Sequence, residues 1–257
     1  MIFNRMEYPG LSSLLLLIFW ICMLLGCQSD ELDQGNVPKE ENTNNIPNKI
    51  MPLGASRVQG LTPWFESYRY ALWKDLIDGG WDFDYIGTET ETGSYPNYEG
   101  LSFDPDHQGK MSWTSEQIFE ELESILHETG YPDIVLFSSP GGNDILDGLP
   151  YKNIIENIND IIDLFQDRNP EIVILIEQLA PGKTSFMTPE LTAIFDQAVL
   201  DVETIAQEQS NDDSQVIPVN MYDGFQDRYL SDDIHYSEEG AKFIAERYYE
   251  VLQTVLE

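Results

Sequence analysis

The order of the expected elements predicts an α/β fold, a three-layer α/β/α sandwich with a five-stranded parallel sheet. From residue 46 onward, apolar strand-like segments alternate with amphipathic helix-like segments. This alternation is typical of a parallel sheet that helices cover on both faces. Asp133–Ser138 (DIVLFS) and Ile172–Glu177 (IVILIE) contain continuous apolar runs, which indicates that they are central strands buried on both sides.

Three further strands and five helices complete this prediction. The other strands are expected at Ile50–Leu53, Trp81–Ile86 and Val216–Met221. The helices are expected at Trp64–Ile77, Ser115–His127, Tyr151–Phe165, Pro189–Gln207 and Ser237–Leu256, the second opening with a capping box from Thr114 to Gln117. Residues 88–113 show no clear element. Because loops of about 26 residues are usually functional or disordered, we expect this aromatic loop to be ordered and to face the substrate.

The composition of the first 45 residues indicates a targeting segment and a tether, which leaves residues 46–257 as the folded domain. Residues 11–25 are almost wholly apolar, too few for a membrane-spanning helix but typical of a signal-peptide core. The core ends in Leu24-Leu25-Gly26-Cys27, which resembles the lipobox of bacterial lipoproteins. We therefore expect a lipoprotein signal peptide over 1–26, lipidation of Cys27 and a flexible tether over 27–45. An uncleaved N-terminal anchor is the alternative.

The charge and the cysteines exclude several classes of function. The formal net charge of the 257-residue chain is −33, and so acidic a protein repels nucleic acid and anionic membranes. We expect contact with a membrane only through the lipid anchor. Both cysteines, Cys22 and Cys27, precede the domain, so it contains no disulfide, thiol nucleophile or zinc–thiolate site. The sequence also lacks an EF-hand-type calcium loop.

Ser56 follows the first expected strand, where an open α/β sheet places its ligands. The small residues Gly54 and Ala55 before it allow a sharp turn that leaves the hydroxyl unobstructed. A plain turn serine that caps the next helix is the alternative. The nucleophile elbow of α/β-hydrolases is not expected, because Val58 stands where its last glycine would be.

Two later motifs favour a functional role for Ser56. Asp232 stands three residues before His235, where its carboxylate can reach Nδ1, fix the tautomer and leave Nε2 free as a base. Gly141 and Gly142 follow the third strand and let the backbone approach a ligand, while Asn143 offers an amide donor for a developing oxyanion. Alone, the first motif could be a loop hydrogen-bond pair and the second an ordinary turn. Their occurrence after different strands favours one shared site.

With these motifs the chain resembles the SGNH hydrolases, also called the GDSL family, over essentially all of residues 49–257. Gly54-Ala55-Ser56 resembles the first block of the family, Gly141–Asp144 the third and Asp232–His235 the fifth. The resemblance implies the flavodoxin-like SGNH fold and a reaction that needs no metal or cofactor. It also implies the following roles: Ser56 as nucleophile, His235 as general base, Asp232 as orienting acid, and Asn143 and the backbone of Ser56 as oxyanion-hole donors.

Two positions depart from the family pattern. Ala55 stands where the first block has an aspartate. That aspartate is not a member of the triad, so its loss can loosen the turn without removing the chemistry. Ser112 stands where the second block has a glycine that donates its backbone N–H. Since serine keeps this N–H, the resemblance implies that Ser112 is a further oxyanion-hole donor.

A narrower resemblance connects the chain to the family 3 carbohydrate esterases, which deacetylate xylan. The segments that carry it are Tyr68-Arg69, Asp106–Gly109 and Trp113-Thr114. It implies a serine esterase that hydrolyses short-chain esters, above all acetyl esters on polysaccharides, through an acyl-enzyme. Arg57, Trp113 and Gly142 are the residues expected to contact the substrate, with a solvated arginine as the alternative for Arg57.

Two other functions remain open at this point. A lipid or thioester acylhydrolase on the same fold would require a long apolar acyl channel, which the polar, aromatic loop 88–113 disfavours. A non-catalytic glycan-binding lipoprotein would have to keep the fold without turnover. The segment 27–31, CQSDE, resembles the acidic signal of some surface-exposed lipoproteins. We therefore expect the protein at the outer membrane or cell surface, on the periplasmic or extracellular face.

Overall fold

A seven-stranded sheet forms the centre of the fold. The computed structural model describes residues 47–90 and 93–256, so the expected signal peptide, tether and lipidation site at Cys27 lie outside the described residues. The strands are β1 (Lys49–Gly54), β2 (Asp84–Tyr85), β3 (Glu89–Thr90), β4 (Asp106–Gly109), β5 (Ile134–Phe137), β6 (Val173–Gln178) and β7 (Gln215–Asn220). Their order across the sheet is β3-β4-β1-β5-β6-β7, and β2 also pairs with β1.

The sheet is parallel except at one edge. β1 pairs in parallel with β2, β4 and β5, and β5, β6 and β7 continue in the same direction. β2 pairs with the start of β1 at Lys49, and β4 pairs with its end at Gly54, so the two short strands share one position beside β1. Five parallel positions therefore result, which confirms the expected fold class. Only β3, antiparallel to β4, lies outside that pattern.

Residues 88–113 contain more structure than the sequence predicts. β3 and β4 both lie in this stretch, and the strand expected at Trp81–Ile86 is reduced to the two residues of β2. β4 reads DHQG and β3 has only two residues, so neither carries an apolar alternation that could reveal it. β4 forms because it pairs with the end of β1, and β3 forms because it pairs with β4. Both pairings are tertiary contacts.

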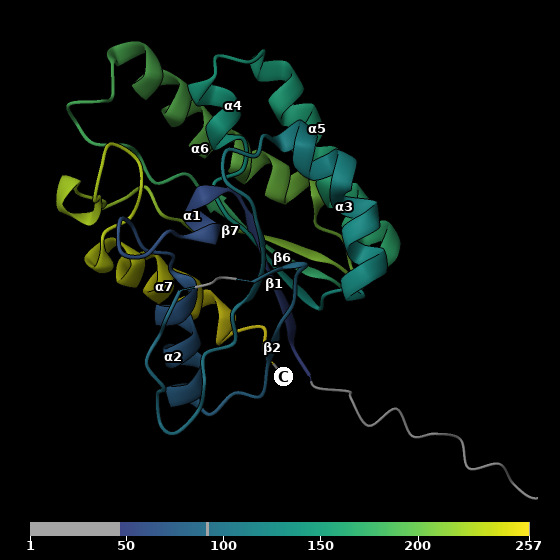
Figure 1. Ribbon diagram of the computed structural model, residues 1–257. Helices are drawn as coiled ribbons and strands as arrows, with labels where there is room; N and C mark the ends of the chain where they lie inside the picture. The colour runs from purple at the N-terminus through teal and green to yellow at the C-terminus, as the bar shows by residue number, and fades with distance from the viewer. Residues whose placement is uncertain (1–46, 91–92, 257) are drawn as a thin grey trace, which may run out of the picture. The chain divides into compact units, whose positions relative to one another are not determined.

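Helices cover both faces of the sheet, as Figure 1 shows. They are α1 (Ser56–Gln59), α2 (Arg69–Gly79), α3 (Ser115–Thr129), α4 (Gly142–Leu146), α5 (Tyr151–Arg168), α6 (Pro189–Gln209) and α7 (Glu238–Leu252), with a 3-10 turn η1 (Asp227–Tyr229). Met51, Val135 and Ile174 belong to a core with α3, α5 and α6. Their chain neighbours Ile50 and Ile134 belong to a second core with α2 and α7. The strands thus alternate between two buried layers, as a three-layer sandwich requires.

Helix α2 begins later than expected. The segment before it turns back on itself, because Leu61 and Phe65 form an isolated bridge and the N–H of Trp64 donates to the carbonyl of Leu61. Phe65 packs against a loop near the end of the chain, and this contact overrides the helical spacing of the apolar residues. The capping box that opens α3 is present, with Thr114 and Gln117 bonding each other reciprocally.

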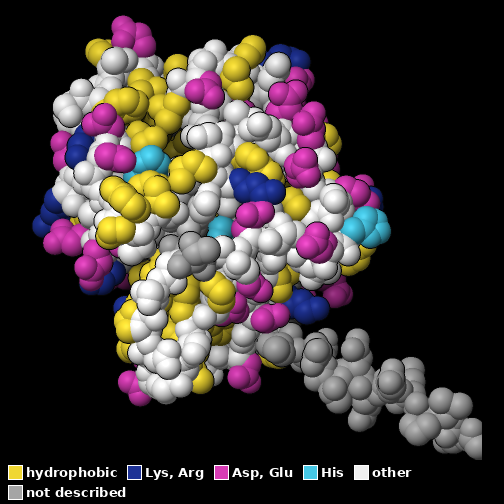
Figure 2. Space-filling model, in the orientation of Figure 1, with side chains coloured by type: hydrophobic (Ala, Val, Ile, Leu, Met, Phe, Trp, Pro, Cys, Tyr) yellow, Lys and Arg dark blue, Asp and Glu magenta, His cyan; other side chains and the backbone are white. Residues whose placement is uncertain are grey.

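The surface agrees with the acidic composition. Figure 2 shows Asp and Glu side chains spread over the visible face, with fewer Lys and Arg side chains among them. Within residues 47–90 and 93–256, no helix has both the length and the apolar character needed to cross a bilayer.

Candidate active site

Ser56 lies at the carboxyl end of β1, as the first residue of the short helix α1. Gly54 makes this turn possible. Its φ is +155°, and a Cβ there would lie 2.7 Å from the carbonyl oxygen of Ser138 and 2.9 Å from the side chain of Val58. Only glycine fits this close approach of β1 to β5. Ser56 itself is only 7% exposed.

His235 and Asp232 lie beside Ser56, although they come from the other end of the chain. The Nε2 atom of His235 is 3.0 Å from Oγ of Ser56, and its Nδ1 is 2.7 Å from Oδ2 of Asp232. The other oxygen of Asp232 accepts the backbone N–H groups of Ile234 and His235 at 2.9 and 2.7 Å. This arrangement places a proton on Nδ1, because a carboxylate can only accept.

The environment of Asp232 keeps it ionised. Partial burial acts to raise the pKa of this carboxyl, but the two backbone N–H donors and His235 outweigh it, so the pKa lies below its usual value. The ring of Phe65 stacks on that of His235, with centroids 4.0 Å apart and an angle of 15° between the planes. Contacts on the ring face and at Nδ1 therefore hold the orientation of His235.

Asn143 reaches the same site from the next strand. The turn after β5 passes through Gly141, whose φ is +69°, and α4 then carries Gly142 and Asn143. One N–H of the Asn143 amide donates to the carbonyl of Trp113 at 2.8 Å. An amide carries two N–H groups, so a second donor remains.

A small cavity joins several of the predicted residues. Its volume is about 40 Å³. Ser56, Arg57, Gly142 and Asn143 line it together with apolar side chains that include Leu146, Leu179 and Phe195. Trp113 is not among its lining residues and reaches Asn143 only through its carbonyl, while its ring lies under the ammonium group of Lys110 at 4.5 Å.

Ser112 occupies a backbone position that favours glycine. Its φ is +63°, in the left-handed region. The residue is exposed, and its N–H makes no hydrogen bond to another residue within 47–90 or 93–256. It does not line the cavity beside Ser56. The structure thus brings Ser56, Asn143, Asp232 and His235 together, whereas Ser112 stays at the edge of the group.

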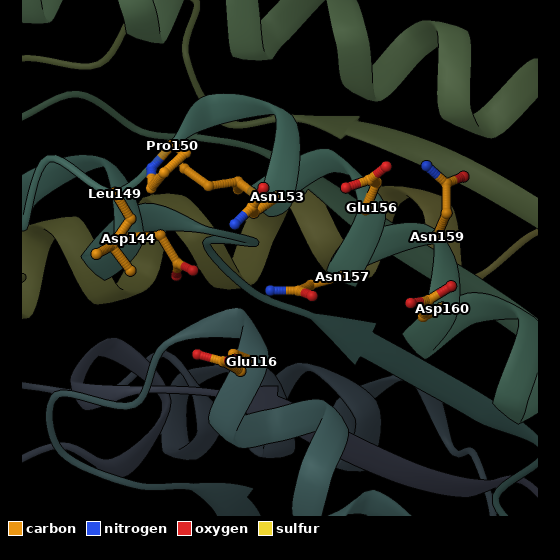
Figure 3. A pocket seen from close by; sticks show the side chains of 10 residues that line it. Glu116, Asp144, Leu149, Pro150, Asn153, Glu156, Asn157, Asn159 and Asp160 are labelled. Carbon is orange, nitrogen blue, oxygen red and sulfur yellow. The ribbon is translucent and has the colours of Figure 1, made fainter.

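Another hollow of the described residues is larger than the cavity beside Ser56 and lies elsewhere. It measures about 570 Å³ and lies between α3, the end of α4 and α5. Figure 3 shows it lined by carboxylates and amides, among them Glu116, Asn153, Asn157 and Asp160. None of the predicted site residues lines this hollow. No group of three or more His, Cys, Asp or Glu side chains in the described parts of the chain could hold a metal ion.

Sequence reasoning missed the buried carboxylate of Glu177 at the end of β6. This residue is 0% exposed, and it accepts hydrogen bonds from the hydroxyl of Ser138 and from the backbone and hydroxyl of Ser139. The available signal was an acidic residue closing the apolar run IVILI. Its role could not be read from the sequence because these donors lie about 40 residues earlier in the chain, directly after β5.

Comparison with known proteins finds similarity at the level of the whole fold. Neither a scan against protein-family models nor a search of curated proteins finds a match. Among solved structures, a family 3 carbohydrate esterase from Clostridium thermocellum is 26% identical, with a TM-score of 0.64 over 82% of this chain and 99% of that one. An acetyl esterase crystallised with acetate is 22% identical, with a TM-score of 0.70 over 81% and 97% of the two chains. A GDSL-like lipase from Bacteroides thetaiotaomicron is 13% identical, with a TM-score of 0.58 over 81% and 89%.

The chain has the fold of the SGNH/GDSL hydrolases. The same likeness supports the enzyme class of ester hydrolase. On this fold, Ser56 opens the helix after the first strand, Asn143 lies after β5, and the Asp232–His235 turn precedes the last helix. The polar groups therefore meet at the carboxyl ends of the parallel strands, where open α/β sheets form their sites.

Proposed function

We propose that the protein is a serine esterase in which Ser56, His235 and Asp232 form a catalytic triad. The observation that carries this proposal is the continuous chain of hydrogen bonds from Oγ of Ser56 through the ring of His235 to Asp232, with distances of 3.0 and 2.7 Å. A serine, a base within reach of it and a carboxylate that orients the base are the parts that acyl transfer needs.

The proposed reaction has two steps. His235 takes the proton of Ser56 as Oγ attacks the ester carbonyl, and it then protonates the departing alcohol, which leaves an acyl-enzyme. Water, deprotonated by the same nitrogen, attacks the acyl carbon and releases the carboxylic acid and free Ser56. Asp232 stabilises the imidazolium in both steps. The second amide N–H of Asn143 and the backbone N–H groups of Ser56 and Ser112 would hold the oxyanion.

The substrate we propose is a short acyl ester, above all acetyl, carried on a polysaccharide. The cavity of about 40 Å³ beside Ser56 has room for about three water-sized groups, which is the size of an acetyl group. Similarity to an acetyl esterase and to a carbohydrate esterase supports the same choice. Of the three residues expected to contact the substrate, Arg57 and Gly142 line this cavity and Trp113 does not.

The small cavity also bears on the alternatives. A lipid or thioester acylhydrolase needs a channel for a long acyl chain, and the cavity beside Ser56 offers no such length. A glycan-binding protein without turnover would have no need for the hydrogen bonds that join Ser56, His235 and Asp232. The likeness to a GDSL-like lipase, at 13% identity and a TM-score of 0.58, is weaker than the likeness to the two esterases.

We also propose that Cys27 is lipidated and that the mature protein lies at the outer membrane or cell surface. This proposal rests on the signal-peptide core and on Leu24-Leu25-Gly26-Cys27. Mass spectrometry of the protein from its membrane fraction should find acyl chains on Cys27. Cys27→Ala should move the protein out of that fraction, and an unchanged distribution would contradict the assignment.

The decisive experiment measures acetate release from p-nitrophenyl acetate and from acetylated xylan, with Ser56→Ala as the matched variant. Activity that disappears in Ser56→Ala while the fold is kept would support the serine esterase. The xylan result tests the polysaccharide. A folded parent that is inactive on both substrates and on longer acyl esters would overturn the hydrolase proposal and favour the binding protein.

Asn143→Ala tests the oxyanion hole separately. Loss of one oxyanion donor lowers kcat by about 10²–10³-fold, since the interaction forms only in the transition state. KM should change little, because the ground-state carbonyl needs this donor less. A rise in KM with unchanged kcat would instead assign Asn143 to substrate binding.

A further inference from the structure

The guanidinium group of Arg57 connects three loops that meet around Ser56. Its Nε donates to the carbonyl of Ile234 at 2.9 Å, and its Nη1 donates to the carbonyl of Ala180 at 2.9 Å and to the hydroxyl of Ser139 at 3.3 Å. The group also lies over the ring of Tyr236, 4.8 Å from its centroid. Arg57 is therefore held in place and is not the solvated arginine that the sequence left as an alternative.

Three of these partners lie close in the chain to a residue of the candidate site. Arg57 itself follows Ser56, and Ile234 and Tyr236 flank His235. Ser139 begins the turn that leads to Asn143. One side chain thus spans the segments that carry the proposed nucleophile, base and oxyanion donor.

The carboxylate of Glu177 carries the charge opposite to that of Arg57 and is connected to it through Ser139. Its carboxylate accepts the hydroxyl of Ser139 at 3.2 Å and the backbone N–H of Ser139 at 3.0 Å, and the same hydroxyl accepts from Arg57. The hydroxyl of Tyr236 is also within 3.4 Å of Glu177. A buried carboxylate is stable only when it is bonded and paired, so Glu177 and Arg57 stabilise each other through Ser139 and Tyr236.

Ser139 shows that this network sets the backbone as well. Its φ is +47°, a strained value for a residue with a side chain. The two hydrogen bonds to Glu177 hold it there, and the turn that follows delivers Asn143. The strain lies at the site and is maintained by contacts from outside it.

We propose that Arg57 is a positioning residue, which keeps Ser56 and His235 at hydrogen-bond distance and uses Glu177 as its counter-charge. The inference rests on the proposed function, because it assigns Arg57 a role in that reaction. The competing role is direct substrate contact: Nε and Nη1 use three of the five guanidinium N–H groups, and the two on Nη2 have no partner among the described residues.

The test compares Arg57→Ala and Arg57→Lys with the parent, and uses Arg168→Ala as the matched control. Arg168 pairs with Glu123 on the far helices, so it is an arginine without contact to the site. Arg57→Ala should lower kcat by about 10²-fold and leave KM within about threefold, because small displacements of reacting groups have costs of this size. The kcat of Arg57→Lys should lie between those of the parent and Arg57→Ala, since an ammonium group cannot donate hydrogen bonds to all three loops as the planar guanidinium does.

Added guanidinium, at a concentration that leaves the parent folded, should restore part of the activity of Arg57→Ala and none to Arg57→Lys. A rise in KM with unchanged kcat would overturn the positioning role in favour of substrate contact. Activity equal to that of Arg168→Ala would overturn any role of Arg57 in the reaction.

A spectroscopic reading separates this inference from the proposed function. The proton between His235 Nδ1 and Asp232 should give a far-downfield resonance in the full-length protein, which Asp232→Asn should remove. That resonance should broaden or vanish in Arg57→Ala and persist in Arg168→Ala, whether or not any ester is hydrolysed. If it persists in folded Arg57→Ala, the positioning role is wrong. If the parent shows no Ser56-dependent esterase activity, the proposed function is wrong.

If Arg57→Ala does not fold, Glu177→Gln carries the same test. Glutamine has the same shape but no charge, and it offers one acceptor oxygen for the two donors of Ser139. Glu177→Gln should lower kcat with little effect on KM and weaken the downfield resonance. Unchanged values of both in a folded Glu177→Gln variant would overturn the proposal.

Discussion

At the scale of single residues, the backbone of Ser112 gives the most direct evidence about a departure from the family pattern. Its φ of +63° is a conformation that glycine adopts freely and serine does not. The sequence resemblance aligns Ser112 with a family glycine, and the structure has here a backbone typical of glycine with a serine side chain. The exposed side chain can be accommodated, and the N–H that the proposed oxyanion hole needs is unchanged.

Ser112→Gly should therefore stabilise the protein. Relief of the left-handed strain, reduced by the extra freedom of glycine in the unfolded chain, leaves a gain of about 0.5–1 kcal/mol in the free energy of unfolding. Urea denaturation measures it. Ser102→Gly is the control, because Ser102 is exposed and does not have a positive φ, so it should lose stability. An equal loss of stability in both variants would show that the backbone of Ser112 is not strained.

Asp104 makes stability depend on pH. Burial raises the pKa of its carboxyl to about 6, although the backbone N–H groups of Tyr85 and Asp106 donate to it. The folded state thus holds this proton more tightly than the unfolded chain does. The contribution is present in full below pH 4 and is lost as the pH rises through 6.

From pH 5 to pH 7 this loss should be about 1 kcal/mol, after allowance for the partial exposure of the side chain. In Asp104→Asn, the free energy of unfolding should decrease less than in the parent over this interval. Asp212→Asn, at an exposed turn, should keep the parent's profile. If Asp104→Asn also keeps it, another group is responsible.

At the scale of elements, helix α7 is fitted tightly to the turn that precedes it. A Cβ on Gly240, in the first turn of this helix, would lie 2.0 Å from the carbonyl oxygen of Tyr229. The backbone of Ser237 also donates to that carbonyl. Between these two contacts the chain passes through Asp232 and His235, so the start of α7 fixes the loop that carries them.

For Gly240→Ala, helix propensity and packing predict opposite changes in the stability of the protein. Helix propensity alone favours alanine by about 1 kcal/mol. The clash with Tyr229 should reverse this and destabilise the protein by about 1–3 kcal/mol, with a parallel fall in kcat. Glu239→Ala, the exposed neighbour, should change stability by less. A stabilised Gly240→Ala would show that the turn can move without cost.

The elements also show where sequence reasoning ends. The long apolar strands and the amphipathic helices lie close to their predicted positions, because the periodicity of apolar residues is visible in consecutive residues of the sequence. β3 and β4 were not, since they are short and polar, and β4 forms as a partner of β1 while β3 forms as a partner of β4. Helix α2 starts at Arg69 and not at Trp64, because the ring of Phe65 stacks on that of His235 and the segment before the helix turns back to make this contact.

At the scale of the whole molecule, the net charge of −33 is the dominant property. Like charges repel one another across the surface, and this repulsion favours the unfolded chain. Salt shortens its range, with a Debye length of about 10 Å at 0.1 M and about 3 Å at 1 M.

The melting temperature should therefore rise by several degrees between low and high sodium chloride. Differential scanning calorimetry at several salt concentrations measures it. A variant with Glu120, Glu121 and Glu128 of α3 replaced by glutamine should melt higher in low salt and gain less from added salt, since all three are exposed. Equal salt dependence in both proteins would show that repulsion is not the cause.

The sequence by itself determined the fold class and pointed to Ser56, Asn143, Asp232 and His235, because strand runs, helix stripes and short motifs are local patterns. Only the tertiary structure decided that these residues meet, and how. The bond from Arg57 to Ile234, the buried Glu177 beneath Ser139 and the stacking of Phe65 on His235 all join residues that are far apart in the chain. Such contacts depend on how strands and loops pack in space, and no spacing along the sequence records them.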